Sequence, residues 1–520
     1  MRLIEGLAAR GVEVVFGIPG VHTVEMYRGL SGSTVRHVTA RHEQGCAFMA
    51  DGYARVSGKP GVALVITGPG LLNALTAMAQ ARADSVPILV VSGVNRRASL
   101  GRGLGLLHEL PNQAAMVDPL CPTRQISDPA QVGAVLDWAF ATMATGRPGP
   151  VHIEIPTDVM PMPCPALAAP ADFAPAPLPA AGDLAMAAAK LNAAKRVVVL
   201  AGGGVRGQDA ALRSLAGVLD APVIQTVNAR GLMHRSPLSV PASPSLDATR
   251  ALITQADQVL AIGTEFGPTD YDMYVRGGFP DLSGMIRIDI CALQLARQPC
   301  AEPLCGDAGA VIAALLPLIS PKRGDGSARA EKTRLAARAE LGGLDLLMPA
   351  RLDMVETIRA AMPGAIIVGD STQPVYAANL YYDHDRPGGW FNAATGFGAL
   401  GYGPGAAVGA AIAAPGTKVV CLIGDGGLQF SPGELRTAVD EKLPITFIVW
   451  NNAAFREIAD AMRGANTEVI GCAPSPLNME PFAAACDLPF MSMRQDSETL
   501  HWSLLQTYDG PRMIEIRVSV

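Results

Sequence analysis

The sequence lacks the features that mark nucleic-acid-binding, membrane and secreted proteins. Acidic residues outnumber basic ones by 47 to 41, so no basic surface for nucleic acid or for acidic lipid is expected. The most apolar windows, such as residues 61–81, contain Gly, Pro, Asn and Thr, which favours buried strands and helices over a membrane span. Charges at Arg2, Glu5 and Arg10 interrupt the apolar N-terminus, so a signal peptide is not expected.

The cysteines show no pattern typical of disulfides or zinc sites. There are nine of them, an odd number, and no CxxC pair occurs anywhere in the sequence. A reducing compartment is therefore expected, and we predict a cytoplasmic protein. A charged fraction of 17% with an apolar fraction of 49% is typical of a large α/β enzyme and not of a disordered chain.

The length of the chain, 520 residues, is too great for one hydrophobic core, so about three domains are expected. Short β-rich runs alternate with helical stretches, which predicts an α/β fold in which each domain has a parallel sheet flanked by helices. Residues 160–182 are rich in Pro and Ala and predict a linker, and the charged stretch from Pro321 to about Gly343, helical in composition, predicts a second. The predicted domains span residues 1–160, 183–320 and 344–520, and the first and third look similar in scale and strand content.

Two short motifs in the last domain predict a site for a metal ion and a phosphate. A buried strand ends at Gly424 and is followed by Asp425, Gly426 and Gly427. Glycine N–H groups at a strand end can approach a phosphate, and a carboxylate in the same turn can hold a divalent cation against it. Asn452 follows the next strand, and oxygens from Asp, Asn and phosphate suit Mg²⁺. Each motif alone is an ordinary turn signal, so only their combination indicates function.

This combination resembles the signature of thiamine-diphosphate enzymes, in which GDG is followed further along by NN. The rest of the chain resembles the group formed by acetolactate synthase, pyruvate oxidase and benzaldehyde lyase. The motifs that carry the resemblance occur in the family's order along essentially the whole chain: GVEVVFGIPG, RHEQGCAFMADGYAR, ITGPGLLNALTAMAQARADSVPILVVSG, ELPNQ, RPGPVHIEIPTDV, ATGFGALGYGPGAAVGA and GDGGLQF…NN.

The resemblance implies thiamine diphosphate (ThDP) and Mg²⁺ as cofactors. Asp425 and Asn452 match the two side-chain ligands of the metal ion, and Ala454 matches the residue whose carbonyl is the third protein ligand. ThDP in this family spans two subunits, with its pyrimidine end on the first domain of one and its diphosphate end on the third domain of the other. At least a homodimer is therefore implied, and a dimer of dimers is expected.

Further residues match positions that contact the cofactor in the family. Gly424, Gly426 and Gly427 match the turn that packs against the diphosphate. Leu400 matches the large apolar residue beneath the cofactor, where most relatives have Met or Ile, and Gly398 belongs to the same motif.

Glu43, in RHEQG, matches the glutamate that forms a hydrogen bond to N1′ of the aminopyrimidine in these enzymes. The C2 proton of the thiazolium is weakly acidic and its removal needs a base, which proton exchange between a carboxylic acid and N1′ can provide. A lone glutamate near a helix start more often only interacts with the helix dipole. The distant GDG…NN pair favours the catalytic interpretation.

Several residues bear on the substrate, which the resemblance implies to be a small 2-oxo acid that loses CO₂. Gln113 matches the active-site glutamine of relatives that join two substrates. His22 lies where benzaldehyde lyase has a histidine, and Val21 lies where pyruvate decarboxylases have an acid. His22 and His108 are candidate proton donors, although a lone histidine is more often structural.

The residues after the metal-binding asparagine depart from the acetolactate synthase pattern NNxxxGMV, because this chain has Arg456 and Glu457 in NNAAFREIAD. Together with LLHELPNQ and GDSTQPVYAAN, this stretch more closely resembles 5-guanidino-2-oxopentanoate decarboxylases. Glu457 or Asp370 is a candidate partner for the guanidinium of such a substrate, and Gln373 is a further candidate contact. The alternative is that these acids form ion pairs at a surface or interface.

The expected function is therefore that of a ThDP- and Mg²⁺-dependent 2-oxo acid decarboxylase or carboligase. Acetolactate synthase is the alternative within the class, and an inactive nucleotide-binding regulatory paralogue is the alternative from another class.

A glycine motif in the middle domain suggests another ligand. Gly202-x-Gly204-x-x-Gly207 follows a strand and precedes a helix, with Asp220 further on, which is a pattern typical of dinucleotide binding. Several relatives hold the ADP part of FAD in this domain and others have lost it, so FAD is an alternative that is not favoured. An NAD-dependent dehydrogenase is disfavoured because it leaves RHEQG and GDG…NN unexplained.

Overall fold

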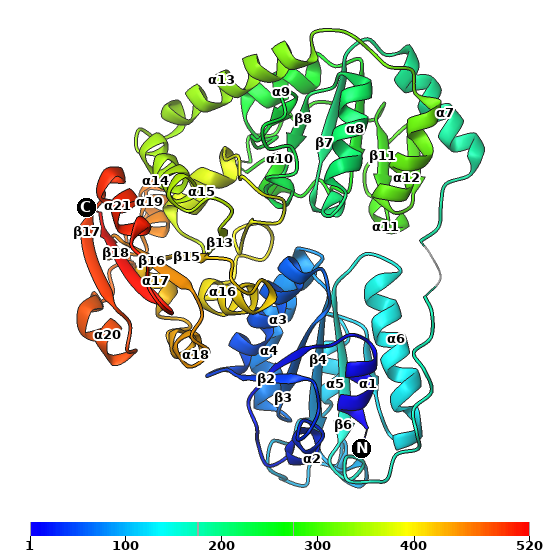
Figure 1. The fold of residues 1–520 in the computed structure, drawn as a ribbon, viewed down its shortest axis with the longest axis vertical. Coiled ribbons are helices and arrows are strands. Elements are labelled where there is room, and N and C mark those ends of the chain that lie inside the picture. Colours follow the sequence, from blue (N-terminus) through cyan, green and yellow to red (C-terminus); the bar gives the residue numbers. More distant parts are fainter. Residues whose placement is uncertain (1, 174–175, 274, 519–520) are drawn as a thin grey trace.

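The computed structural model describes residues 2–173, 176–273 and 275–518. Within these residues the chain forms three units, each built on a six-stranded parallel sheet with helices on its faces (Figure 1). The central strands are buried on both faces, which explains why they read as continuous apolar runs such as VVVLA and VVCLIG. The predicted α/β fold with parallel sheets is confirmed.

The first and third units have the same sheet topology. The strand order is β2-β1-β3-β4-β6-β5 in the first unit and β14-β13-β15-β16-β18-β17 in the third, so every strand of one has a counterpart in the other. The second unit differs, because its order β12-β11-β10-β7-β8-β9 is the one typical of dinucleotide-binding folds.

The strands of the three sheets are distributed evenly along the chain. The first sheet contains β1 Val14–Gly17, β2 Arg36–Thr39, β3 Gly61–Val65, β4 Ile88–Val94, β5 Thr123–Gln125 and β6 Pro150–Pro156. The second contains β7 Val197–Ala201, β8 Val223–Gln225, β9 Ser239–Val240, β10 Gln258–Ile262, β11 Ile286–Asp289 and β12 Glu302–Cys305. The third contains β13 Ile366–Gly369, β14 Trp390–Asn392, β15 Val419–Gly424, β16 Ile445–Asn451, β17 Phe490–Arg494 and β18 Arg512–Arg517.

Helices connect successive strands of each sheet. Those of the first unit are α1 Leu3–Ala9, α2 Val24–Arg28, α3 Glu43–Ser57, α4 Pro69–Ala83, η1 Arg97–Ser99, α5 Gln113–Val117, η2 Pro129–Gln131 and α6 Val132–Ala144. Those of the second are α7 Ala181–Ala193, η3 Gly203–Val205, α8 Asp209–Leu219, η4 Val227–Ala229, α9 Asp247–Thr254, α10 Pro268–Tyr271, α11 Ala292–Leu295, α12 Ala308–Leu315 and η5 Leu316–Leu318. The remainder are α13 Gly326–Leu344, α14 Met348–Ala361, α15 Gln373–Leu380, α16 Tyr402–Ala413, α17 Asp425–Leu428, α18 Glu434–Asp440, α19 Arg456–Gly464, α20 Met479–Ala485 and α21 Ser497–Leu505. Among the described residues, none of these helices is both long enough and apolar enough to cross a lipid bilayer.

The two segments predicted as linkers have different structures. Residues 163–173 and 176–180 contain no helix or strand, and residues 174–175 of this predicted linker lie outside the described part of the chain. The second segment contains α13, a 19-residue helix, as its composition indicated. Ala330, Ala337 and Leu341 of α13 are buried in the same apolar cluster as residues of α9 and α14, so this helix packs against the second and third units and joins them.

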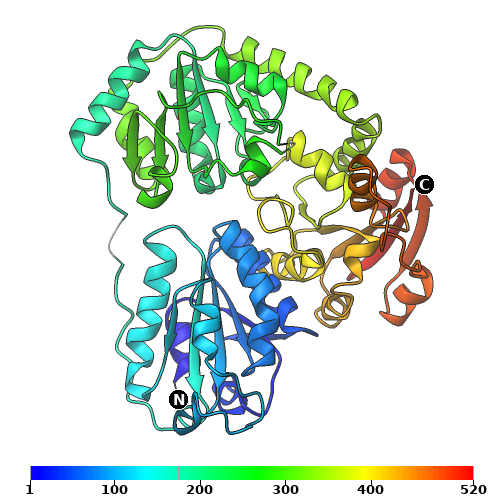
Figure 2. The ribbon, with the colours of Figure 1, turned by 180° about the vertical axis from the view of Figure 1, so that it is seen from behind.

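Helix α3 of the first unit crosses α16 of the third unit at very close range (Figures 1 and 2). Two glycines make this distance possible. A side chain on Gly52 would overlap the backbone of Ala406, and one on Gly409 would overlap the backbone of Met49. The crossing therefore fixes the first unit against the third through direct contact of the two helix backbones.

The crossing predicts that Gly409→Ala destabilises the protein, although alanine normally favours a helix. Because backbone atoms cannot move aside as a flexible side chain can, we expect a loss of about 1–3 kcal/mol in the free energy of unfolding, measured by urea denaturation. Gly217→Ala in α8 is the matched control, because nothing lies within 4 Å of a side chain added there. The control should be neutral or stabilising by up to about 1 kcal/mol. Equal effects of the two substitutions would contradict this account of the crossing.

Candidate active site

The residues predicted to bind the metal ion lie together at the edge of the third sheet. Parallel strands β15 and β16 pair in register up to Gly424 and Trp450, so the turns that follow them are neighbours. The Asn452 backbone N–H donates to Asp425 Oδ1 at 3.3 Å. Asn452 Oδ1 accepts from the Ala454 backbone N–H at 3.2 Å, so the three predicted ligand residues lie in two neighbouring turns.

The glycines of the GDGG turn leave a cradle that side chains would fill. Asp425–Leu428 form the short helix α17 where the sequence predicted a turn. A Cβ added to Gly426 would lie 2.6 Å from the Phe455 ring, and one added to Gly427 would lie 3.0 Å from Asp370 Oδ1. Only glycine fits at both positions, and its N–H groups at a helix start favour an anion.

The carboxylate of Asp425 suits a bound cation. The residue is buried, which raises the pKa of its carboxyl group, and no basic side chain pairs with it among the described residues. No group of three or more His, Cys, Asp or Glu side chains arranged to bind a metal occurs in the described part of the chain. The predicted Mg²⁺ site is of another kind, with one carboxylate, one amide and one backbone carbonyl, and a diphosphate would complete it. The residues present therefore fit both Mg²⁺ and the diphosphate of ThDP.

Asp370 supports the turn that carries Leu400. Its fully buried carboxylate accepts from the backbone N–H groups of Ser371 at 2.8 Å and Gly403 at 2.9 Å. Burial raises the pKa of this carboxyl group to about 6. Leu400 precedes Gly401, the left-handed residue before α16, and Gly398 two residues earlier is also left-handed. Because Asp370 faces backbone N–H groups, the structure does not support the hypothesis that it meets a substrate, and Glu457 is left as the acidic candidate.

Glu43 is the first residue of α3 and is half-buried. Asn73 Nδ2 donates to Glu43 Oε2 at 3.0 Å, and Gly70 leaves room beside Oε1, because a Cβ added to Gly70 would lie 3.4 Å from this oxygen. Both residues belong to the start of α4, within the ITGPGLLNALT motif. Sequence reasoning named that motif but not these two contacts, because a contact between helices that start after different strands has no local sequence signal.

The Glu43 carboxylate and the Asp425 turn lie in different units of the chain. Among the described residues, no hydrogen bond or ion pair connects Glu43 to Asp425, Asn452 or Ala454. The residues predicted to contact the two ends of the cofactor therefore form two groups, which we call half-sites, one in the first unit and one in the third.

The histidines singled out in the sequence pack against each other. The rings of His22 and His108 meet edge to face with their centroids 5.2 Å apart. Burial and the neighbouring His108 lower the pKa of His22, so the neutral form of His22 is favoured. His22 Nδ1 is buried and has no hydrogen-bond partner in the described part of the chain. Val21 is 71% exposed and its side chain is free to meet another molecule.

Gln113 is buried, and its amide has partners only within the first unit among the described residues. Oε1 accepts from the Gly68 backbone N–H at 2.9 Å. Nε2 donates to the Gly93 carbonyl at 2.9 Å and to Glu154 Oε2 at 3.1 Å. The predicted contact between Gln113 and a substrate would require this amide to leave its partners.

Gln373 connects the metal-binding turn to Glu457. Gln373 Oε1 accepts from Trp450 Nε1 at 3.1 Å and from Asn452 Nδ2 at 3.4 Å, which directs its Nε2 to Glu457 Oε1 at 2.8 Å. Glu457 is exposed in the first turn of α19. Arg456 instead pairs with Asp460 at 3.4 Å. An exposed carboxylate is thereby held next to the predicted Mg²⁺ ligand.

A cavity of about 620 Å³ lies where the three units meet, and Gly202, Gly204 and Gly207 line it. Asp220 does not line this cavity, because its carboxylate accepts from backbone N–H groups at the start of α13. Asp289, at the end of β11, lines it instead, and burial raises the pKa of its carboxyl group.

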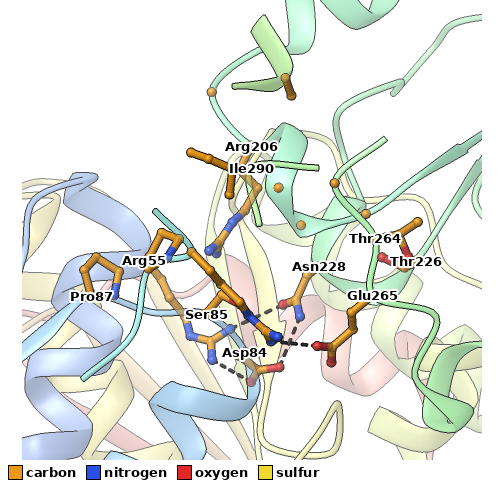
Figure 3. A pocket seen from close by; sticks show the side chains of 18 of the residues that line it. Arg55, Asp84, Ser85, Pro87, Arg206, Thr226, Asn228, Thr264, Glu265 and Ile290 are labelled. Atoms are coloured by element: carbon orange, nitrogen blue, oxygen red, sulfur yellow. Dashed lines mark hydrogen bonds and ion pairs between the residues drawn. The ribbon is translucent and has the colours of Figure 1, made fainter. Parts of the chain in front are cut away.

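Polar and charged side chains meet beside this cavity, and Figure 3 shows those of the first and second units. Asp84 accepts from Arg55 of α3 at 2.7 Å, from Asn228 of the second unit at 3.2 Å and from Thr395 of the third at 2.8 Å. Figure 3 shows the Arg206 guanidinium pointing into the cavity towards Arg55. The glycine motif predicted from the sequence thus faces a space of ligand size.

Three models of thiamine pyrophosphate enzymes match the chain. The N-terminal TPP binding domain matches residues 2–116, the central domain residues 184–315, and the C-terminal TPP binding domain residues 370–516. These ranges fall on the first, second and third units.

Individual relatives match most of the length of the chain. It is 42% identical over 482 residues to the protein named "Probable 2-ketoarginine decarboxylase AruI" of Pseudomonas aeruginosa, with 91% of this chain and 85% of that protein covered. It is 30% identical over 535 residues to the acetolactate synthase isozyme 1 large subunit of Escherichia coli, with 99% and 93% covered. A solved structure described as a candidate thiamin diphosphate-dependent enzyme from Mycobacterium smegmatis has the same fold, with a TM-score of 0.82 at 24% identity over 100% of this chain and 98% of that one. The chain therefore belongs to the family of thiamine pyrophosphate enzymes.

Proposed function

We propose that the protein is a ThDP- and Mg²⁺-dependent 2-oxo acid decarboxylase that acts on 5-guanidino-2-oxopentanoate, also called 2-ketoarginine. The observation that supports this choice of substrate is the exposed carboxylate of Glu457, which Gln373 holds beside Asn452. The name of the Pseudomonas aeruginosa relative, at 42% identity, supports the same choice.

The residues of the two half-sites fit the parts of the cofactor. Asp425, Asn452 and the Ala454 carbonyl would hold Mg²⁺, and the N–H groups of Gly426 and Gly427 would meet the diphosphate. Glu43 would bind the aminopyrimidine and exchange a proton with it. When bound, ThDP supplies the nucleophilic carbon and the electron sink that loss of CO₂ requires. Decarboxylation has no redox step, so FAD is not part of the proposal.

Glu457 would recognise the guanidinium at the far end of the substrate. A carboxylate and a guanidinium form charge-assisted hydrogen bonds, which are stronger than neutral ones. No basic side chain pairs with Glu457 among the described residues, and its neighbour Arg456 is engaged with Asp460. Gln373 would fix the position of the acid without neutralising it.

A cytoplasmic homodimer, itself paired into a dimer of dimers, is the assembly we propose. The half-sites of one chain lie in different units without a bond between them, so a cofactor that needs both can bind between two chains. Exposed apolar side chains occur close in sequence to each half-site: Val21 and Leu107 near the two histidines, and Phe397 and Phe430 near Leu400 and the GDGG turn.

Glu43→Gln should abolish most of the activity. The amide is isosteric but cannot exchange a proton with the cofactor, so we expect CO₂ release from 5-guanidino-2-oxopentanoate to fall roughly 100-fold or more. ThDP binding, measured by calorimetric titration, should change far less. Equal CO₂ release by the two proteins, or none by either with any 2-oxo acid, would contradict the catalytic role and favour the inactive paralogue.

Glu457→Gln should weaken selection of the guanidino substrate. Loss of a hydrogen bond to a charged group predicts a fall of roughly 10- to 100-fold in kcat/KM for 5-guanidino-2-oxopentanoate, with little change for pyruvate. Glu480→Gln, which alters an exposed glutamate of α20, is the matched control. An equal fall in kcat/KM for both substrates would show that Glu457 does not recognise the guanidinium.

The products distinguish the proposal from its alternative. With ThDP, Mg²⁺ and 5-guanidino-2-oxopentanoate, we expect 4-guanidinobutanal and CO₂ as the main products, measured by mass spectrometry. Acetolactate formed from pyruvate, with no turnover of the guanidino acid, would instead assign the protein as an acetolactate synthase.

A further inference from the structure

A buried carboxylate without a basic partner lies behind the Glu43 half-site. Glu154, near the middle of β6, is 3% exposed, and burial raises the pKa of its carboxyl group. Among the described residues it pairs with no Lys, Arg or His. Its two oxygens instead accept from two glutamine amides: Oε1 from Gln125 Nε2 at 2.7 Å, and Oε2 from Gln113 Nε2 at 3.1 Å. Taking a carboxylate out of water in this way is costly, so its retention calls for a physical reason.

The carboxylate helps to determine which way the Gln113 amide faces, together with the Gly93 carbonyl and the Ser92 hydroxyl, which accept from the same Nε2 at 2.9 and 3.2 Å. An ionised carboxylate only accepts hydrogen bonds, so the NH₂ group of Gln113 must face Glu154 and the carbonyl oxygen must face away. That oxygen accepts from the backbone N–H of Gly68 at 2.9 Å. Without Glu154, the NH₂ group loses its only carboxylate acceptor among the three described groups that accept from it, and the Gln113 oxygen is held less firmly against the Gly68 N–H group.

Gly68 begins the segment that meets Glu43. It has φ of 65° and ψ of −106°, a conformation suited to glycine, and it is the N-cap of α4. The first turn of α4 then carries Gly70 and Asn73, which face the two oxygens of Glu43. A polar path therefore runs from Glu154 through Gln113 and Gly68 to the start of α4.

We propose that Glu154 is a positioning residue for Glu43. By orienting the Gln113 amide, it holds the Gly68 turn and keeps Asn73 and Gly70 in place against the Glu43 carboxylate. The role of Gln113 is then to support this turn and not to touch the substrate. The inference rests on the proposed function for its effect on catalysis, but its structural part concerns the protein without cofactor.

The test measures hydrogen exchange at the Gly68 amide in the cofactor-free protein, together with steady-state kinetics of the loaded enzyme. In Glu154→Gln the Gly68 amide should exchange at least roughly 10-fold faster, because its acceptor, Gln113 Oε1, is held less firmly. The value of kcat should fall by a similar factor, while KM changes much less. Glu5→Gln, at an exposed site of α1, is the control and should change neither.

The double variant Glu154→Gln/Gln113→Glu exchanges the two side chains. The carboxylate now at position 113 can accept from the Gly68 N–H group, and the amide now at position 154 can donate to that carboxylate. The double variant should recover part of the protection and part of kcat, since the groups that then lack the Gln113 donor are the Gly93 carbonyl and the Ser92 hydroxyl. Recovery of neither would overturn the proposal, as would unchanged exchange and kcat in Glu154→Gln. If Glu154→Gln does not fold, Gln113→Met breaks the same path, and unchanged protection of Gly68 in that variant would overturn the proposal. Absence of decarboxylation by the wild-type protein would instead count against the proposed function alone.

Discussion

The close crossing of α3 and α16 is the contact that fixes the two half-sites of one chain relative to each other. Glu43 begins α3, and the turn carrying Leu400 leads into α16, so each helix presents a predicted cofactor residue at its start. Gly52 and Gly409 allow the two backbones to touch, which leaves little freedom for either helix to shift. Close-packed interiors resist compression and displacement, so a contact between backbones transmits position better than one between flexible side chains.

Buried carboxylates hold the loops around the two half-sites. Asp370 accepts from backbone N–H groups at the start of α16, and Glu154 accepts from two amides behind the Gly68 turn. Burial disfavours the charged form of each group and raises its pKa, while the hydrogen bonds offset part of that cost. Among the described residues neither acid pairs with a basic side chain, so the role of both lies in the backbone and amide groups that they hold in place.

The second unit shows that fold and ligand must be argued separately. Its strand order and glycine motif are those of dinucleotide-binding proteins, and a cavity lies at the expected edge of the sheet. However, Asp220 accepts a hydrogen bond from the backbone just before α13. Beside the cavity, Asp84 of the first unit accepts hydrogen bonds from the second and third units. A fold does not by itself identify a ligand, so the chemistry of this cavity is a separate question from that of the active site.

The sequence alone determined the α/β fold, the three-unit organisation and the grouping of Asp425 with Asn452, because these depend on local runs and on turns at the ends of neighbouring strands. The order of the family's motifs also made Glu43 a candidate catalytic residue, which stays a prediction. Only the tertiary structure decided that Asp370 is buried, that Gln113 is held by Glu154, and that Gln373 connects Asn452 to Glu457. Those contacts join residues far apart in the chain, and the pattern of residue types around each one does not specify the direction in which a side chain points.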